Sequence, residues 1–277
     1  MIDMAAYRLQ VEEAVAFLRD RLPFLPEIVV ALGTGLGGLA GSLARQTVIP
    51  YREIPHFPLS TVASHAGNLV CGELRGKNVA VLQGRVHCYE GYTAREVALP
   101  MRVLALLGAR LAIVTNASGG LNPDFAPGTI MVCTDHLNLL GDNPLRGPNV
   151  EEWGPRFPDL SKPYAPHLVE TALAAAQTLR LDKMATGTYV CIPGPSLETP
   201  AETRYLRSCG ADAVGMSSLP EILVALHAGL QVLGLAVVAN ANDPDNLQPI
   251  LLEDIVRKAE ETEPLLLKLI AEIITRY

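Results

Sequence analysis

Four short segments of the sequence place glycines and hydrogen-bonding side chains after apolar runs. They are GTGLGG (33–38), QGRVHCYEGY (83–92), TNASGGLNP (115–123) and VANANDPDN (238–246). If the apolar runs are buried strands, the segments meet at the carboxyl edge of one sheet, where open α/β sheets bind their ligands. Arginine, histidine and glycine-turn N–H groups together suit an oxyanion. The sequence therefore predicts a small-molecule site that holds an anion.

The first segment is ambiguous, because Gly33, Gly35 and Gly38 fit G-x-G-x-x-G, the spacing that cradles a dinucleotide pyrophosphate. The hydroxyl of Thr34 and the N–H groups of a glycine turn can hold a small free anion equally well. A dinucleotide site also needs an acidic residue at the end of the second strand, about 20 residues further on. Glu53 is near that spacing but follows a short run interrupted by proline. A dinucleotide-binding oxidoreductase or regulatory module is therefore only a remote alternative.

The second segment carries Arg85, His87 and Tyr89 at alternate positions. If the preceding strand continues, these three side chains share one face of it. An arginine offers a planar fork of donors, and a histidine adds one more hydrogen bond, so the pair suits an oxyanion. The structural alternative is a salt-bridged arginine beside a buried histidine.

Two helix-start patterns help to separate structural carboxylates from available ones. TPAE at 199–202 and SLPE at 218–221 both predict capping boxes, in which the final glutamate binds the start of its own helix. Glu198 and Ser217 lie just outside these helices and are left for a ligand, although either could be an ordinary loop or turn residue. Asn240, at the end of an apolar strand, could contact a ligand or simply begin a turn.

Composition limits the class of protein. The chain has 277 residues, of which 49% are hydrophobic and 18% charged, and this predicts a compact enzyme-like globule with room for subunit interfaces. A net charge of -7 argues against a nucleic-acid partner. No apolar run approaches the roughly 18 residues of a membrane span, and the acidic N-terminal segment does not resemble a secretory signal. The five scattered cysteines, without C-x-x-C, predict reduced thiols in a cytoplasmic protein.

Several kinds of chemistry lack their sequence patterns. The six histidines show neither H-E-x-x-H nor paired ligand spacing, so no metal site is expected. There is no G-x-S-x-G nucleophile elbow and no G-x-x-x-x-G-K-[ST] phosphate loop, which argues against a serine hydrolase and a P-loop enzyme.

Hydrophobic patterning places the motifs on alternating strands and helices. Apolar, β-branched runs predict strands at 27–32, 111–115, 129–134, 186–192 and 231–239, and a hairpin at 68–83 turning at Arg75-Gly76-Lys77. Helical spacing predicts helices at 4–22, 94–108, 166–181, 200–209, 219–229 and 250–277. This alternation predicts an α/β protein with a largely parallel or mixed central sheet.

Residues 141–166 are rich in proline and glycine, as a linker would be, but contain Trp153, Phe157 and Tyr164. A solvated linker does not need aromatic side chains, and long loops in compact domains are usually functional. We therefore expect a single domain over 1–277, in which this loop covers the substrate or bridges subunits.

Taken in order, the motifs resemble the trimeric class of purine nucleoside phosphorylases, in the family that also includes methylthioadenosine phosphorylases. The matching segments are GTGLGG, STVASHAG, QGRVHCYEGY, TNASGGLNP, DHLNLLGDNPLRGPN, GPSLET, GADAVGMSS and the late Asn240. The resemblance implies one nucleoside phosphorylase-like α/β domain, with a mixed, mostly parallel sheet flanked by helices. It implies a cytoplasmic homotrimer that needs no cofactor and uses inorganic phosphate as a co-substrate.

The implied reaction is reversible phosphorolysis, in which a purine nucleoside and phosphate give the free base and ribose 1-phosphate for purine salvage. Matched by position, the implied phosphate contacts are Thr34, Arg85, His87, Ser217 and the backbone N–H of Ala117. The implied nucleoside contacts are Tyr89, Phe157 of a neighbouring subunit, Glu198, Met216, Asn240 and Leu252. The implied catalytic residues are His87, Glu198 and Asn240.

The residue types agree with this chemistry. Phosphate is itself a nucleophile, so the site must position it and stabilise the charge that develops on the base. The amide of Asn240 can contact N7 and O6, and Glu198 can accept from N1–H of a 6-oxopurine. Inosine and guanosine fit this pattern. Adenosine fits less well, because its N1 carries no proton.

Three positions depart from the family pattern. Asn240 lies between Ala239 and Ala241, where vertebrate relatives have Thr and Lys, and Leu197 replaces a Phe that stacks on the base. Leu252 stands where the family usually has a His for the ribose 5′-hydroxyl. An apolar 5′ pocket raises a second hypothesis, a 5′-methylthio-nucleoside phosphorylase acting on 5′-methylthioinosine. Methylthioadenosine itself fits less well, because its phosphorylases usually carry Asp in place of Asn240.

Overall fold

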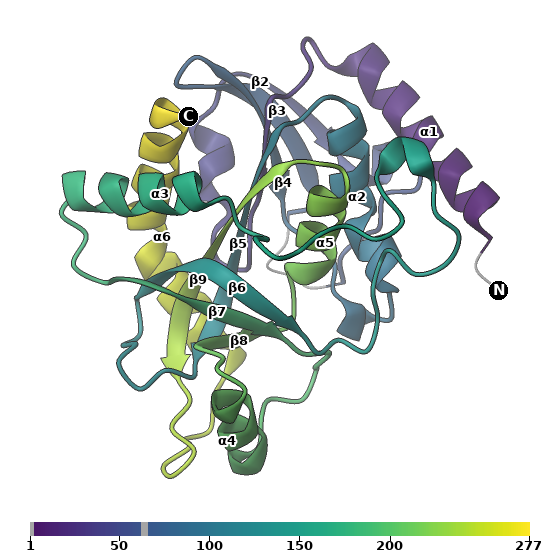
Figure 1. Ribbon diagram of the computed structural model, residues 1–277. Coiled ribbons are helices and arrows are strands. Elements are labelled where there is room, and N and C mark those ends of the chain that lie inside the picture. The colour runs from purple at the N-terminus through teal and green to yellow at the C-terminus, as the bar shows by residue number, and fades with distance from the viewer. Residues whose placement is uncertain (1–2, 62–65) are drawn as a thin grey trace.

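Strand β5 (Leu111–Gly120) lies at the centre of one mixed sheet in the computed structural model, which describes residues 3–61 and 66–277 (Figure 1). The other strands are β1 (Ile28–Ala31), β2 (Ala44–Pro50), β3 (Asn68–Leu74), β4 (Lys77–Gln83), β6 (Ile130–Asn138), β7 (Met184–Cys191), β8 (Ala213–Gly215) and β9 (Gln231–Ala241). Their order is β2-β3-β4-β1-β5-β8-β7-β6-β9, and β5 also pairs with β9. The pairings from β5 through β8, β7, β6 and β9 therefore return to β5 and close a ring.

Parallel pairing aligns the strand ends that carry the polar motifs. Strand β1 is parallel to both β4 and β5, and β5 is parallel to β9. The carboxyl ends of these four strands consequently lie at one edge of the sheet. Strand β1 is buried along its whole length, as expected for a parallel strand covered on both faces.

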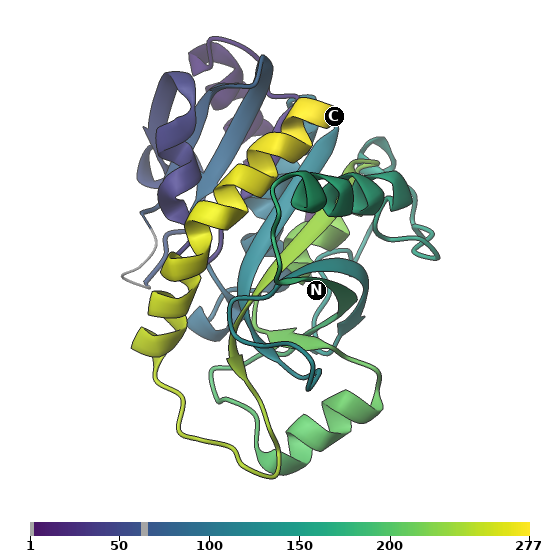
Figure 2. The same cartoon turned by 90° about the vertical axis from the view of Figure 1, so that its left-hand side faces the viewer.

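Helices cover both faces of the sheet. One hydrophobic cluster joins α1 (Met4–Arg21), α2 (Ala94–Leu106) and α5 (Leu219–His227) to the sheet, and another joins α3 (Pro166–Thr178) and α6 (Leu252–Arg276) to its other face. Figure 2 shows α6 running along its face of the sheet, and the short α4 (Pro200–Ser208) lies apart. This arrangement confirms the predicted single-domain α/β class with a mixed sheet flanked by helices.

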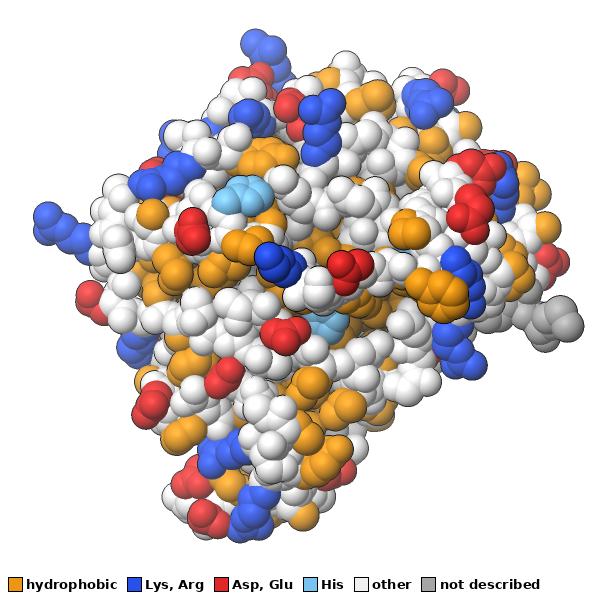
Figure 3. Space-filling model, viewed as in Figure 1, with side chains coloured by type: hydrophobic (Ala, Val, Ile, Leu, Met, Phe, Trp, Pro, Cys, Tyr) orange, Lys and Arg blue, Asp and Glu red, His pale blue; other side chains and the backbone are white. Residues whose placement is uncertain are grey.

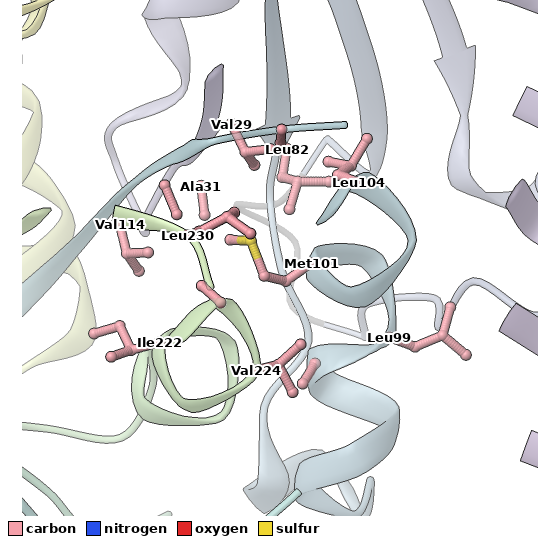
Figure 4. Packing of buried hydrophobic residues seen from close by; sticks show 14 of the residues in the cluster. Val29, Ala31, Leu82, Leu99, Met101, Leu104, Val114, Ile222, Val224 and Leu230 are labelled. Carbon is pink, nitrogen blue, oxygen red and sulfur yellow. The ribbon is translucent and has the colours of Figure 1, made fainter. Parts of the chain in front are cut away.

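The core between α2 and α5 is filled by aliphatic side chains. Figure 4 shows Met101 pointing from α2 toward α5 and Leu230, and Met101 is fully buried. Truncating such a side chain to alanine typically costs about 2–5 kcal/mol of folding free energy. This packing fixes α5, whose N-terminus approaches the polar edge of the sheet.

The hairpin is confirmed, with a tighter turn than expected. Strands β3 and β4 pair from Asn68 with Gln83 to Leu74 with Lys77. Arg75 and Gly76 alone form the loop, and both have positive φ, at 53° and 76°. Two such residues match the twist of a two-residue hairpin, and glycine adopts this conformation without a steric penalty.

Two strands were not predicted, and β5, β6 and β9 continue beyond their predicted ends. Strand β2 is mostly exposed and lies at the edge of the sheet, so its sequence lacks a strong apolar pattern. Strand β8 has three residues. Strand β5 continues to Gly120, through the TNASGG motif, because its last residues pair with β8 and β9.

The loop at 141–166 is pinned to the core by two of its aromatic residues. Trp153 is buried and makes an edge contact with Tyr7, with ring centroids 5.8 Å apart, and Tyr164 is also buried. Phe157 lies between them and is 85% exposed. The loop is therefore held at two points and presents one aromatic side chain outward.

The surface and helices add two further observations. On the face shown in Figure 3, basic and acidic side chains are interspersed and form no single basic stripe. Among the described residues, no helix is both long and apolar enough to cross a membrane.

Candidate active site

A cavity of about 430 Å³ opens where the four parallel strands end. Its lining comes from the segments after β1 and β4, the ends of β5 and β9, the segments before α4 and α5, and the start of α6. All the predicted site residues except Phe157 line it: Thr34, Arg85, His87, Tyr89, Ala117, Glu198, Met216, Ser217, Asn240 and Leu252. The structure thus brings together residues that are far apart in the sequence.

One side of the cavity, which we call the anion end, consists of Thr34, Arg85, His87 and Ser217. Arg85 is buried, and its Nη1 donates to the carbonyl of Thr115 at 2.7 Å and to Oγ of Ser217 at 3.3 Å. These contacts fix the plane of the guanidinium group beside the cavity. A fixed fork of donors is well suited to a tetrahedral oxyanion.

The guanidinium group of Arg85 also has a buried carboxylate partner that was not predicted. Nη2 of Arg85 lies 3.2 Å from Oε2 of Glu221, and both side chains are only 4% exposed. Burial raises the pKa of Glu221 above its ordinary value, and the charge of Arg85 opposes this shift. Because a buried ion left alone is costly, each member of the pair holds the other in place.

This pairing contradicts the predicted capping box at 218–221. Ser218 has a φ of 69° and makes no side-chain cap; instead its Oγ accepts from Nδ2 of Asn116 at 2.9 Å. Glu221 points to Arg85 and not to the start of its own helix. The other predicted capping box, from Thr199 to Glu202, is confirmed.

His87 is held by Glu90. The backbone N–H of His87 donates to Oε1 of Glu90 at 2.8 Å, and Nδ1 lies 2.9 Å from the same oxygen. Burial, reinforced by the charge of Arg85, lowers the pKa of His87 to about 4, although Glu90 opposes the shift. His87 is therefore neutral near pH 7. Because a carboxylate only accepts, Nδ1 carries the proton and Nε2 is an acceptor.

Arg85, His87 and Tyr89 were expected to share one face of a strand that continues from β4, and this expectation is wrong. Strand β4 ends at Gln83, and Cys88–Glu90 forms a short 3₁₀ helix. The three side chains nevertheless line the same cavity, and the rings of His87 and Tyr89 stack with centroids 4.6 Å apart.

The glycine loop after β1 is shaped by packing. A Cβ on Gly33 would lie 2.8 Å from Cα of Asn116 on β5, so only glycine fits there. The loop leads into a short 3₁₀ helix, Gly37–Ser42, and the N–H of Gly38 donates to Oε1 of Glu263 on α6 at 2.6 Å. The loop thus opens a short 3₁₀ helix and not the α-helix whose N-terminus holds a pyrophosphate, which argues against a dinucleotide site.

The other side of the cavity, which we call the base end, consists of Glu198, Asn240 and Asn242. Nδ2 of Asn240 donates to Oδ1 of Asn242 at 2.5 Å, and Nδ2 of Asn242 donates to Oε2 of Glu198 at 2.7 Å. Burial raises the pKa of Glu198, and the hydrogen bond from Asn242 opposes that shift. Asn240 belongs to β9, so it does not begin a turn.

Asn242 was missed by the sequence analysis. It follows Asn240 by two positions, and residues two apart in an extended chain point to the same side. That spacing was an available signal, but the turn-like residues NDPDN concealed it.

Between the two ends, the cavity is lined by Tyr89 and Met216 and, at its mouth, by Ile250, Leu252 and Ile255. Leu252 begins α6 and is 59% exposed. The mouth therefore presents an aliphatic wall to any group that projects from a bound ligand.

Two predictions involve residues outside this cavity or outside the described chain. Phe157 does not line the cavity of its own chain. The motif STVASHAG includes residues 62–65, which lie outside the described residues, so the structure does not place that motif. Among the residues that are described, no three His, Cys, Asp or Glu side chains gather as a metal site would require.

Comparison with known proteins agrees with the fold and identifies the family. A family model described as the phosphorylase superfamily matches residues 27–275. The chain is 44% identical over 268 residues to purine nucleoside phosphorylase 1 of Bacillus subtilis (strain 168), covering 97% of this chain and 98% of that protein. It is 46% identical over 243 residues to the purine nucleoside phosphorylase of Mus musculus, covering 86% and 84%.

A solved structure extends the agreement to three dimensions. The crystal structure of schistosoma purine nucleoside phosphorylase in complex with hypoxanthine matches with a TM-score of 0.91 at 38% identity, covering 96% of each chain. The chain therefore belongs to the phosphorylase superfamily, among its purine nucleoside phosphorylases.

Proposed function

We propose that this pentosyltransferase carries out reversible phosphorolysis of inosine and guanosine, giving the free base and ribose 1-phosphate. The observation that carries the proposal is one cavity with a fixed arginine at its anion end and a carboxylate with two amides at its base end. Phosphate is held at the first end and a 6-oxopurine at the second. The hypoxanthine bound by the schistosoma relative is the base of inosine, which supports the same substrate class here.

The anion end binds phosphate through complementary donors and acceptors. Arg85 and the hydroxyls of Thr34 and Ser217 donate to phosphate oxygens, together with the N–H of Ala117. Neutral His87 presents Nε2 as an acceptor, which suits the protonated oxygen of monohydrogen phosphate. The anion is thus bound as a reactant, and we propose that no metal or cofactor takes part.

The reaction is a displacement at C1′ of the ribose. A phosphate oxygen forms a bond to C1′ as the C1′–N9 bond breaks, and the bonding electron pair leaves with the purine. The sugar passes through an oxocarbenium-like state, and the base takes up a proton at N7, which in the overall balance is the proton of monohydrogen phosphate. Fixing phosphate in line with the breaking bond is the main contribution of the anion end.

The base end stabilises the leaving purine. Oδ1 of Asn240 accepts from N7–H as the base gains electron density, and its Nδ2 donates to O6. Ionised Glu198 accepts from N1–H, which inosine and guanosine carry and adenosine lacks. Asn240 binds the departing 6-oxopurine more strongly than the intact nucleoside, as catalysis requires, whereas Glu198 contacts the same N1–H in both and orients the base.

The ribose site involves a second subunit in this proposal. Tyr89 and Met216 contact the sugar within one chain, and Phe157 completes the site of a neighbour in a homotrimer. Its support is the 85% exposure of Phe157 on a loop pinned by Trp153 and Tyr164. Analytical ultracentrifugation should show a trimer, and Phe157→Ala should raise the KM for the nucleoside; a fully active monomer would contradict this part.

A second candidate substrate is favoured by the aliphatic mouth. Ile250, Leu252 and Ile255 would surround a 5′ substituent, and a methylthio group is more compatible with them than a hydroxyl. The enzyme would then act on 5′-methylthioinosine, with the same phosphate and base contacts.

One assay separates these substrates. Base release from inosine, guanosine, adenosine and 5′-methylthioinosine is measured side by side, with and without phosphate. We expect phosphate-dependent release from inosine and guanosine and weak release from adenosine. Equal release without phosphate would mean hydrolysis, which contradicts the proposal. A much higher kcat/KM for 5′-methylthioinosine than for inosine would establish the second candidate.

A further inference from the structure

Asn242 is the most deeply buried polar side chain of the base end, and its backbone is fixed as well. It is 1% exposed. Its N–H donates to the carbonyl of Gly120 at 2.8 Å, and its own carbonyl accepts from Nη2 of Arg207 at 2.7 Å. The side-chain amide is therefore held at a set place between Glu198 and Asn240.

The chemistry of Glu198 sets the direction of this amide. An ionised carboxylate can only accept hydrogen bonds, so Nδ2 of Asn242 must face it. Oδ1 of Asn242 then faces Asn240, which must offer its own Nδ2. The ionised state of Glu198 thus determines the orientation of the Asn240 amide, which Glu198 does not touch.

We propose that Asn242 is a positioning residue that links Glu198 to Asn240 in one directed chain of hydrogen bonds and so sets the preference for 6-oxopurines over 6-aminopurines. This inference rests on the proposed function and adds to it a residue that determines base selectivity.

The directed chain leaves atoms that match a 6-oxopurine. One hydrogen on Nδ2 of Asn240 is used by Asn242, which leaves the other for O6 and leaves Oδ1 for N7–H. The remaining acceptor capacity of Glu198 is available to N1–H. A 6-aminopurine needs an acceptor where Asn240 offers Nδ2–H to position 6, and a donor where Glu198 offers its carboxylate to N1. Both contacts therefore become unfavourable together.

Close packing supports a specific role for this amide. A Cβ on Gly119 would lie 2.9 Å from Nδ2 of Asn242, so glycine at that position leaves the space that the amide fills. Gly119 pairs with Asn240 across β5 and β9, next to a register shift between Ser118 and Gly119. The irregularity in the strand pairing therefore lies beside the linked amides.

Few charged groups act on Glu198, so a change in its pKa can be interpreted. Glu202 on α4 adds to the burial that raises the pKa of Glu198, whereas the hydrogen bond from Asn242 lowers it. Arg207, also on α4, contacts the backbone of Asn242. Removing the amide should raise the pKa of Glu198, so the acid limb of kcat/KM for inosine should move to higher pH.

The test compares inosine with adenosine in three single variants. Asn242→Ala removes the link, and Asn242→Asp keeps its shape but cannot donate to ionised Glu198. Asn122→Ala is the matched control, because Nδ2 of Asn122 also donates to a carboxylate, Asp212 at 2.8 Å, but outside the cavity. We expect both Asn242 variants to lower the inosine-to-adenosine ratio of kcat/KM by about tenfold or more. The control should leave this ratio and the acid limb unchanged.

A double variant tests whether the effect of Asn242 on selectivity acts through Glu198. In Glu198→Gln the acceptor-only constraint is gone, so adding Asn242→Ala should change the ratio by less than about threefold. The inference is overturned if Asn242→Ala and Asn242→Asp both leave the ratio and the acid limb as in the wild type. The same tenfold loss in the Glu198→Gln background would also overturn it.

These outcomes are distinct from failure of the proposed function. That failure appears in the wild type, as base release from inosine that is absent or independent of phosphate. Thermal unfolding of each variant identifies any general loss of folding, which would lower both activities without changing their ratio.

Discussion

The two ends of the cavity differ in how firmly the fold holds their side chains. At the anion end, Arg85, His87 and Ser217 are each at least nine-tenths buried, and Arg85 is locked to Glu221. At the base end, Glu198 and Asn240 are only half-buried, although Asn242, which links them, is 1% exposed. In the proposed reaction, phosphate is the reactant that never varies, whereas the nucleoside does. The rigid end thus positions the nucleophile, and the open end determines selectivity.

The same contrast appears in protonation. Burial lowers the pKa of His87 to about 4, which keeps it neutral, whereas burial raises the pKa of Glu198 above its ordinary value. Both shifts disfavour the charged form. His87 consequently stays neutral near pH 7, and Glu198 is the base-end residue expected to titrate as pH falls.

We expect the largest effect on activity from removing Arg85 at the anion end. Arg85→Ala removes the main phosphate donor and leaves Glu221 as a buried carboxylate without its partner. We expect kcat/KM for phosphate to fall by about a thousandfold, equivalent to roughly 4 kcal/mol. Steady-state kinetics with varied phosphate measure this. Arg45→Ala, at an exposed arginine, is the control and should retain activity; an equal loss in both variants would contradict the assignment.

A smaller effect is expected from changing what the base end recognises. Asn240→Asp replaces the amide donor with an acceptor, which suits the 6-amino group of adenosine. We expect the adenosine-to-inosine ratio of kcat/KM to rise by about a hundredfold. An unchanged ratio would count against Asn240 as a purine contact, while the KM for phosphate should stay near that of the wild type.

The pH profile sharpens the comparison further. Glu198 must be ionised to accept from N1–H, and its pKa lies above its ordinary value. Below that raised pKa, kcat/KM for inosine should fall about tenfold for each pH unit as the carboxyl becomes protonated, and it should recover as pH rises. Glu198→Gln should have no such limb. A limb that persists in this variant would assign the titration to another group.

The smallest expected effect is at the mouth. Leu252→His introduces a donor for a 5′-hydroxyl at an exposed position. We expect the preference for inosine over 5′-methylthioinosine to rise by about three- to tenfold, because water competes for the new contact. Kinetics with the two substrates test this, and a shift toward 5′-methylthioinosine would place the 5′ group elsewhere.

Local patterns predicted most of the fold and singled out part of the candidate site. The hairpin at 68–83, the capping box before α4 and the buried strands all follow from short-range rules, and the structure confirms them. Residue types and spacing singled out Thr34, Arg85, His87, Tyr89, Glu198, Ser217 and Asn240, whereas Ala117, Met216 and Leu252 were expected only from the resemblance to the phosphorylases. Parallel pairing of β1, β4, β5 and β9 brings together the residues that follow these strands, whereas Glu198, Met216, Ser217 and Leu252 reach the cavity from other elements.

The errors arise where distant contacts override a local pattern. SLPE at 218–221 has the form of a capping box, but Glu221 is bound by Arg85 from another part of the chain. Asn242 stands among turn-forming residues, yet β9 carries it to Glu198. Strand β2 was missed because an exposed edge strand needs no alternating apolar pattern. In each case the deciding partner could not be read from neighbouring residues.

The hydrogen bond from Gly38 to Glu263 has a consequence for the order of synthesis. Its two residues are 225 positions apart. A nascent chain exposes the glycine loop early but gains the carboxylate that fixes it only when α6 leaves the ribosome. The segment that holds phosphate in our proposal therefore takes its final form late, together with the sheet face that α6 covers.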